Sequence, residues 1–400
     1  MTERLYLNNP YLRQIDARIV EKIYRNNKYY IKTDKTIFYP NLAGGQPRDK
    51  GTINGIEVLD AYDEEDDIVH VVKDNIHSDK VVLSIDWDNR FDYMQQHSGQ
   101  HLLSAVFYKL FNGETVGFYI GKEYVYIDVN LPEINSEEIA KVEEFANRII
   151  FSNFQIKSYI IEKSDINKYP LVKNSISNSK IRIVEIDGID FSPCCGTHLR
   201  YTGEIGLIKI RKVEKHKGNS RVEFVCGNRA LMDYSWKSNS IKNISNLLSS
   251  KDKEVQYKVF KLFEEKEELE KENRILKEKL YKYKGEELLN KAKYIHGLNF
   301  IYNKFENVEL KEINNIAIYL TSLNRNIVLF GLCNGDYAQF LVGKSTEINI
   351  NMKNIFEEVS KDMEIQGGGN TQIVQGKCEK KNLNLVLEKF YENIIREIKD

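Results

Sequence analysis

The sequence lacks any apolar run near the length of about twenty residues that a helix needs to cross a bilayer. Its first segment, MTERLYLNNPYLRQ, lacks the basic start and apolar stretch of a secretory signal peptide. Cysteine is scarce, with five in 400 residues, and this odd number argues against a disulfide framework. These absences together predict a cytoplasmic protein without a membrane segment.

An excess of charge of one sign is also missing. The 58 Lys and Arg residues nearly balance the 59 Asp and Glu residues, for a net charge of −1. Any contact with nucleic acid must therefore come from local basic patches and not from a global field. The length predicts two or three domains, because one core rarely supports 400 residues.

The periodicity of the sequence predicts an α+β multidomain fold with four segments. Residues 1–85 carry short β-branched and aromatic runs broken by turn residues, which is typical of a β-rich, barrel-like domain. Residues 86–240 mix strand-like alternation with two helical patterns, at 90–111 and from Ser136. Residues 241–295 form a helical spacer, and residues 296–400 form a small α/β domain with one glycine-rich loop.

The spacer contains a heptad pattern that predicts a long, coiled-coil-like helix. Its apolar residues fall seven apart, while Glu and Lys fill most other positions. The alternate seam is poor, because it includes Lys266 and Asn273. A spacer or a homodimer contact in the carboxyl-terminal region is the expected role. The apolar positions are Val255, Leu262, Leu269, Leu276 and Tyr283.

Two short motifs place metal-ligand residues at matching spacing. In MQQHSGQHLL, His97 and His101 lie four residues apart on a helix, so their imidazoles project side by side. In SPCCGTHLR, Cys194 and His198 repeat that spacing around a tight turn, and Cys195 is the adjacent spare. Nitrogen and sulfur ligands of this kind select zinc. One Zn²⁺ per chain is therefore predicted.

The number of protein ligands leaves the role of the zinc open. Four ligands normally mark a closed structural site, while catalytic sites keep a position for water or substrate. Neither motif carries the Glu of an H-E-x-x-H helix, so the sequence offers no obvious general base.

HSGQHLL and CCGTH, with TIFYPNLAGGQPRDKG before them and TGEIGLIKI after, resemble the alanyl-tRNA editing domain. GGGNTQIVQGK resembles the DHH-associated module at the carboxyl end of that family, so nearly the whole chain resembles the long form of the AlaX-type proteins. Two positions depart from the family motifs, because Ala43 and Cys195 each replace a glycine. No Asp-His-His motif occurs, and no aminoacylation domain precedes the editing segment.

The resemblance implies a zinc-dependent trans-editing deacylase. Its substrate would be tRNA(Ala) mischarged with serine or glycine, cleaved at the ester bond. By this resemblance residues 86–240 are the editing domain and residues 296–400 a tRNA-binding domain. The alternative to an enzyme is a tRNA- or RNA-binding protein whose zinc is purely structural.

Candidate residues beyond the ligands follow from the loops. Gln46 lies in a glycine-dense loop, where the backbone approaches closely, so it is expected to reach the site or to be a turn residue on a barrel rim. Thr115, in GETVGFYIG, matches by resemblance a threonine that hydrogen-bonds the hydroxyl of serine. A site built for that hydroxyl discriminates against alanine, which leaves buried polar groups unpaired.

RNA contacts have two candidate locations. Lys209, Arg211, Lys212 and Lys215 form a basic run that could meet acceptor-stem phosphates or be a solvated strand edge. By resemblance, the backbone of Gly367, Gly368 and Gly369 contacts tRNA. Lys344 and Lys377 are candidate phosphate partners or solvated surface lysines.

Overall fold

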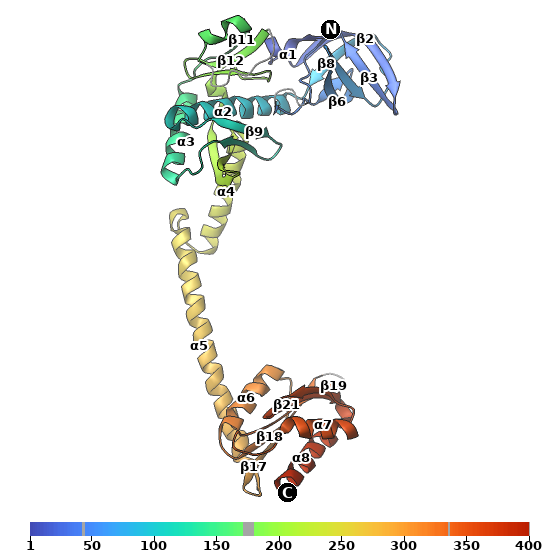
Figure 1. The fold of residues 1–400 in the computed structure, drawn as a ribbon, viewed down its shortest axis with the longest axis vertical. Helices are drawn as coiled ribbons and strands as arrows, with labels where there is room; N and C mark the ends of the chain where they lie inside the picture. The colour runs from blue at the N-terminus through green and yellow to red at the C-terminus, as the bar shows by residue number, and fades with distance from the viewer. Residues whose placement is uncertain (42–44, 171–179, 335–336, 400) are drawn as a thin grey trace. The chain divides into compact units, whose positions relative to one another are not determined.

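The computed structural model describes residues 1–41, 45–170, 180–334 and 337–399. They form two compact units, Met1–Leu247 and Leu248–Asp400 (Figure 1). Both units contain β-sheet and helices, which confirms the mixed α+β multidomain class. No helix in this described part of the chain combines the length and apolar character needed to cross a membrane. Ala43 lies outside the described residues.

The first unit begins with a closed six-stranded barrel in the order β2-β3-β7-β6-β5-β8. Asn26 and Asn27 join β2 to β3 with φ values of 52° and 57°, as a two-residue type I′ hairpin requires. In β8, alternate residues Val81, Leu83 and Ile85 are buried in the barrel core. The barrel strands are β2 (Gln14–Arg25), β3 (Lys28–Thr33), β5 (Gly51–Ile53), β6 (Ile56–Glu64), β7 (Asp67–Val72) and β8 (Lys80–Ile85). Beside them lie β1 (Glu3–Arg4), α1 (Leu5–Asn8) and β4 (Lys35–Thr36).

Helix α2 (Trp87–Phe111) leads out of the barrel and is buried on most of its surface. It begins earlier than Arg90, where the sequence pattern placed it, because the Asp86 side chain accepts a hydrogen bond from the Asn89 backbone N–H and caps the helix. Buried polar side chains on α2 need partners. Gln96, for example, donates to the Cys226 carbonyl at 3.1 Å and accepts from the Cys226 N–H at 2.9 Å.

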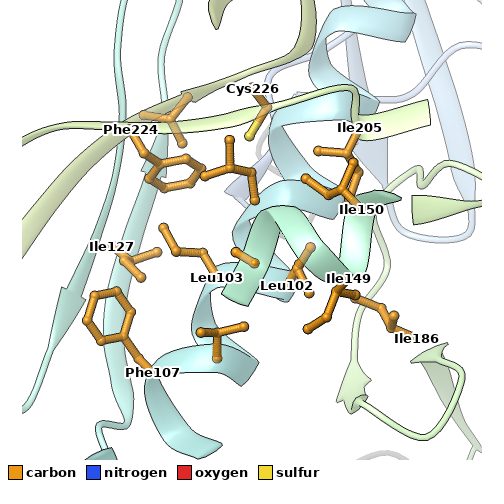
Figure 2. Close-up of a cluster of buried hydrophobic side chains, with 14 of the residues drawn as sticks. Leu102, Leu103, Phe107, Ile127, Ile149, Ile150, Ile186, Ile205, Phe224 and Cys226 are labelled. Carbon is orange, nitrogen blue, oxygen red and sulfur yellow. The ribbon is translucent and has the colours of Figure 1, made fainter. Parts of the chain in front are cut away.

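Two sheets and two helices complete the first unit around α2. Leu102, Leu103 and Phe107 of α2 meet Ile127 and Phe224 from the larger sheet in one apolar core (Figure 2). The larger sheet has the order β14-β15-β10-β9, and β9 is an edge strand. The smaller sheet has the order β11-β12-β13. The larger sheet contains β9 (Thr115–Ile120), β10 (Val125–Val129), β14 (Ile208–His216) and β15 (Asn219–Cys226). The smaller sheet contains β11 (Ile156–Glu162), β12 (Lys180–Ile186) and β13 (Asp190–Pro193).

The first of the remaining helices of this unit begins with a capping box. α3 (Ser136–Phe151) starts where the sequence predicts. Its cap is Asn135, which exchanges hydrogen bonds with Glu138 in a capping box. The others are α4 (Gly227–Leu247), η2 (Lys163–Lys168) and η3 (Thr202–Ile205).

The second unit is a six-stranded sheet covered on both faces, in the order β16-β17-β18-β19-β21-β20. Successive residues of β18 enter two different cores: Leu329 packs toward α7 and α8, and Phe330 packs toward α5 and α6. A central strand buried on both faces explains the continuous apolar run NIVLFGLC. The strands are β16 (Lys293–Ile295), β17 (Leu298–Glu306), β18 (Asn326–Asn334), β19 (Tyr337–Lys344), β20 (Gln366–Gly369) and β21 (Ile373–Glu379). The helices are η4 (Asp252–Glu254), α5 (Val255–Asn290), α6 (Leu310–Ser322), α7 (Met352–Asp362), η5 (Lys380–Asn382) and α8 (Leu383–Lys399).

Candidate metal centre

The two predicted ligand pairs meet in the first unit. His97 and His101 project from one side of α2, with ring centroids 5.2 Å apart, and Cys194 and His198 come from the loop that follows β13. The ligand atoms of all four residues lie within 4.8 Å of one another. The Cys194 Sγ lies 3.4 Å from His97 Nε2 and 3.2 Å from His198 Nε2. Three imidazoles and one thiol therefore converge as a set that can hold a metal ion.

Each imidazole is oriented by a partner at its other nitrogen. A carboxylate and an amide oxygen can only accept hydrogen bonds, so Nδ1 of the facing histidine carries a hydrogen and Nε2 is the nitrogen that faces the cluster. Gln46 Oε1 also accepts from the Thr197 backbone N–H at 3.2 Å, which fixes the amide orientation. The Nδ1 contacts are His97 with Gln46 Oε1 (2.9 Å), His101 with Asp190 Oδ2 (3.2 Å) and His198 with Ser98 Oγ (3.3 Å).

The charge around the sulfur favours the thiolate. Burial raises the pKa of the Cys194 thiol, but the nearby His97 and His198 and hydrogen bonds from His101 and His198 outweigh burial and hold it well below its usual range. Burial and the neighbouring His97 lower the pKa of His198 to about 3. Burial also lowers the pKa of His101, but hydrogen bonds to Asp190 and Cys194 outweigh burial and raise it to about 10, so a metal ion bound here has to displace a proton from this imidazole. The donor set thus includes a deprotonated sulfur and a neutral imidazole, which are the forms that bind metal.

The turn between Cys194 and His198 fits closely against α2. A Cβ on Gly196 would lie 2.1 Å from His97 Cε1, so no other residue fits there without movement. Arg182 of β12 holds the same turn by donating to the carbonyl oxygens of Cys194 at 2.8 Å and Gly196 at 3.0 Å. The turn is thus fixed from both sides.

Gln46 supports a ligand residue. Its side chain is buried, and besides His97 it contacts Thr197, whose hydroxyl accepts from Gln46 Nε2 at 2.8 Å. Its side chain therefore reaches the metal cluster from the loop between β4 and β5, and a catalytic role for Gln46 stays a prediction. Sequence reasoning missed Ser98, Asp190 and Arg182, which hold the other ligands. Of these three residues, only Ser98 carried a signal in the sequence, because it lies inside the HSGQH motif between the two ligand histidines.

Comparison with known proteins agrees with this geometry. The family model described as Threonyl and Alanyl tRNA synthetase second additional domain matches residues 181–223, which include Arg182, Cys194 and His198. The chain is 33% identical to the alanyl-tRNA editing protein AlaX-L of Pyrococcus horikoshii, over 98% of this chain and 100% of that protein. The chain belongs to the alanyl-tRNA editing proteins. Members of this family act as aminoacyl-tRNA deacylases.

Other relatives of this editing protein include one of similar length and one longer chain. It is 28% identical to the alanyl-tRNA editing protein Aarsd1-B of Xenopus laevis, over 91% of this chain and 88% of that protein. It is also 28% identical to the alanine–tRNA ligase of Methanococcus aeolicus, over 94% of this chain. It spans only 41% of the length of that ligase.

Thr115 lies near the metal cluster of the editing protein. It is the first residue of β9, and its hydroxyl donates to Ser104 Oγ at 2.7 Å. Ser104 follows His101 by one helical turn on α2, so the two hydroxyls lie on the side of the helix that carries both histidines. Recognition of the amino acid by Thr115 stays a prediction.

Each residue of the predicted basic run has an acidic partner. Arg211 lies 3.5 Å from Glu223 and 3.6 Å from Asp233, and Lys212 pairs with Glu214. Lys209 and Lys215 pair with Glu143 (2.6 Å) and Glu133 (3.3 Å). RNA contact by these residues stays a prediction, and the acids weaken the positive field that would favour it.

The predicted glycine triplet forms most of the edge strand β20. A Cβ on Gly367 or Gly369 would lie 2.1 Å from a carbonyl oxygen of β21, which explains both glycines by strand packing. A Cβ on Gly368 would meet nothing within 4 Å. Lys377 is exposed, as expected for a solvated surface lysine. Lys344 is not a solvated surface lysine, because it is buried at the end of β19.

Proposed function

We propose that this chain is a zinc-dependent trans-editing enzyme that hydrolyses the ester of tRNA(Ala) mischarged with serine or glycine. The observation that carries the proposal is the convergence of three imidazoles and one thiolate, with three of the four held by outer hydrogen bonds. That donor set suits Zn²⁺, with His97, His101, Cys194 and His198 as its ligands. Family membership supplies the substrate class.

Hydrolysis of an aminoacyl ester needs an attacking water, a polarised carbonyl and a site that admits the right amino acid. Zinc, when bound, supplies positive charge that polarises an oxygen ligand. Water adds to the ester carbonyl carbon, the bond to the ribose oxygen breaks, and the products are the free amino acid and the tRNA. Gln46, Asp190 and Ser98 would hold the imidazoles in one orientation through their hydrogen bonds to Nδ1, and the two acceptor-only oxygens, of Gln46 and Asp190, also fix a hydrogen on that nitrogen.

The proposed selectivity depends on Thr115. Its hydroxyl lies beside the helix face of His101, through Ser104. A hydroxyl at this place can bind the serine side chain, while alanine offers it no partner. The enzyme would therefore release serine and spare correctly charged Ala-tRNA(Ala).

The proposed tRNA contacts involve both units. Gly367, Gly368 and Gly369 lie on an exposed edge strand, where backbone groups are open to RNA, and Gly368 has room on its outer side. Lys209, Arg211 and Lys212 of β14 are exposed or half-buried and remain candidates for acceptor-stem phosphates. We assign residues 1–85 to a barrel domain, 86–240 to the editing domain, 241–295 to the spacer and 296–400 to tRNA binding. The end of the barrel at Ile85 and the end of α5 at Asn290 support two of these boundaries, whereas the division between the compact units lies at Leu247, the end of α4.

We propose that α5 forms a homodimer contact. Leu262, Leu269 and Leu276 repeat every seven residues on this helix and are all exposed. Sedimentation velocity of the wild type and of Leu269→Lys tests this. A dimer that the variant converts to a monomer supports the contact, and a monomeric wild type refutes it.

The decisive experiment compares two neighbouring cysteines. Cys194→Ala removes a proposed ligand, while Cys195→Ala changes an exposed residue outside the cluster. Zinc content and cleavage of Ser-tRNA(Ala), Gly-tRNA(Ala) and Ala-tRNA(Ala) are measured for both and for the wild type. We expect one zinc per chain and selective cleavage by the wild type and Cys195→Ala, with loss of both in Cys194→Ala. Zinc binding without any cleavage would leave an RNA-binding protein with a structural zinc as the better account.

A further inference from the structure

Three tyrosines gather on the outer face of the larger sheet. Tyr119 of β9 and Tyr126 of β10 are direct cross-strand partners, with ring centroids 5.5 Å apart and an interplanar angle of 25°. Tyr124 lies two residues before Tyr126, on the same face, at 6.4 Å and 16°. Tyr119 and Tyr124 are each 45% exposed. We call these three residues the tyrosine cluster.

The tyrosine cluster is held in place by its surroundings. A Cβ on Gly121 would lie 2.4 Å from Tyr119 Cε1, so this glycine makes room for the ring at the tip of the β9–β10 hairpin. The tip is anchored by Arg229, which donates to the Gly121 carbonyl at 2.7 Å.

Beneath the cluster, the Arg221 guanidinium lies 3.7 Å from the centre of the Tyr126 ring. Two hydrogen bonds to Asp128, of 2.8 and 2.9 Å, hold that guanidinium. Rings fixed in this way lose little entropy when a ligand stacks on them.

The tyrosine cluster and the metal centre lie on opposite faces of the edge strand β9. β9 is an edge strand of its sheet, and neighbouring residues on a strand point to opposite faces. Phe118, next to Tyr119, therefore points the other way, where its ring stacks near His97 at 6.1 Å and 28°. Phe118 is 38% exposed although Gly45 packs against its ring, so part of this side chain at the strand edge is accessible. A chain that reaches the metal centre past Phe118 can continue over the edge onto Tyr119.

We propose that the tyrosine cluster stacks the unpaired nucleotides that precede the esterified 3′ end of the substrate RNA. This inference rests on the proposed function, because it takes the ester to be bound at the metal centre. The nucleotides next to that ester are single-stranded, and unpaired bases are recognised by stacking on aromatic side chains. Stacking of this kind tolerates any base and adds affinity without reading sequence.

The test uses two uncharged RNA hairpins with the acceptor-stem sequence of tRNA(Ala). One keeps the unpaired 3′ nucleotides, and the other ends blunt. Fluorescence anisotropy gives the affinity of the full chain for each. We expect the wild type to prefer the hairpin with unpaired nucleotides by about tenfold, as one stacked base provides. Tyr119→Ala combined with Tyr124→Ala should abolish the preference, and Tyr119→Phe combined with Tyr124→Phe should keep it.

The matched control is another tyrosine pair on a hairpin of the same unit, of which Tyr24 is exposed and Tyr29 is half-buried. The two are cross-strand partners at the end of β2 and the start of β3, with ring centroids 4.8 Å apart. Tyr24→Ala should leave the preference unchanged. A wild type without the preference overturns the proposal, and so does a double alanine variant that keeps it.

Failure of the proposed function would look different. The RNA probes are not esterified, so binding is read without any hydrolysis. A protein that cleaves no aminoacyl-tRNA but prefers the unpaired hairpin refutes the enzyme and keeps the stacking surface. A protein that cleaves Ser-tRNA(Ala) but shows no preference for the unpaired hairpin supports the enzyme and refutes the stacking surface. In an active enzyme, the double alanine variant should raise KM about tenfold and leave kcat unchanged.

Discussion

Arg90 and Asp49 form a fully buried ion pair between α2 and the barrel. The Arg90 Nε donates to Asp49 Oδ1 at 2.8 Å, and its Nη2 makes a second, short contact with Oδ2. Arg90 also donates to the carbonyl oxygens of Pro10 and Ile37. Asp49 and Gln46 lie in the same loop, and Gln46 contacts His97. The ion pair therefore fastens this loop to α2, the helix that carries His97.

Removing one partner of this pair should be costly. Arg90→Met leaves the Asp49 carboxylate buried without its cation, which typically costs about 3–5 kcal/mol. Urea unfolding followed through the first unit measures this loss. Arg148→Met is the control, because Arg148 and Glu144 form an exposed pair whose loss costs less than about 1 kcal/mol. Equal effects of the two variants would refute a structural role for the buried pair.

Gly196→Ala should weaken metal binding. The new Cβ would lie 2.1 Å from the His97 ring, so either the ring or the Cys194–His198 turn must shift. We expect zinc affinity to fall about 10- to 100-fold, as it does when the orientation of a ligand is disturbed. Competition with a chromogenic chelator measures the affinity. Gly117→Ala provides the comparison, since its Cβ would make only an ordinary contact at 3.4 Å with Asp128, and it should bind zinc like the wild type.

His70 should make the barrel sensitive to acid. Burial lowers its pKa to about 4, against about 6.5 in the unfolded chain. Between these values the unfolded chain binds the extra proton, so stability rises with pH across the window and is lost as pH falls below about 6.5. From pH 6.5 to 5.5 the loss should be about 1 kcal/mol, because the slope reaches about 1.4 kcal/mol per pH unit only well below the unfolded pKa.

Chemical denaturation at several pH values tests this, with His70→Gln as the comparison. The variant should show a flatter dependence over the same window, because it has no proton to take up. Parallel curves for the two proteins would show that His70 does not cause the acid sensitivity.

Thr115→Val tests the proposed recognition of serine. Valine keeps the shape of threonine and removes the hydroxyl that donates to Ser104. We expect kcat/KM for Ser-tRNA(Ala) to fall about tenfold, the worth of one hydrogen bond of about 1.4 kcal/mol. Cleavage of Gly-tRNA(Ala) should change little, because glycine has no side-chain hydroxyl. An equal loss on both substrates would assign Thr115 to general structure and not to selectivity.

The sequence predicted the residues of the metal cluster because their spacing follows from local geometry. A four-residue separation on a helix places His97 beside His101 wherever the helix packs. The outer partners carry no such signal. Asp190 meets His101 only because β13 lies against α2, and Arg182 reaches the Cys194 turn across two strands of one sheet. Such contacts depend on tertiary structure, which a single sequence does not encode at any fixed spacing.

The environment of the basic residues also depends on tertiary structure that the sequence pattern does not show. Lys209 and Arg211 alternate on β14 as basic residues, but their acidic partners come from α3, β15 and α4. A run of like charge in the sequence was thus neutralised by neighbours from other elements. Lys344 ends a strand whose preceding residues enter the core, and burial of the strand takes the lysine with it.

The contacts of the metal centre join parts of the chain that lie far apart in the sequence. His97 pairs with Gln46 across 51 residues, with Cys194 across 97, and His101 pairs with Asp190 across 89. The four ligand residues therefore meet only in chains in which the barrel, α2 and the small sheet are correctly joined. Zinc bound at the proposed ligands would stabilise only such chains, because its binding free energy adds to the stability of the state that binds it. Uptake of the ion would then report that the first unit has finished folding.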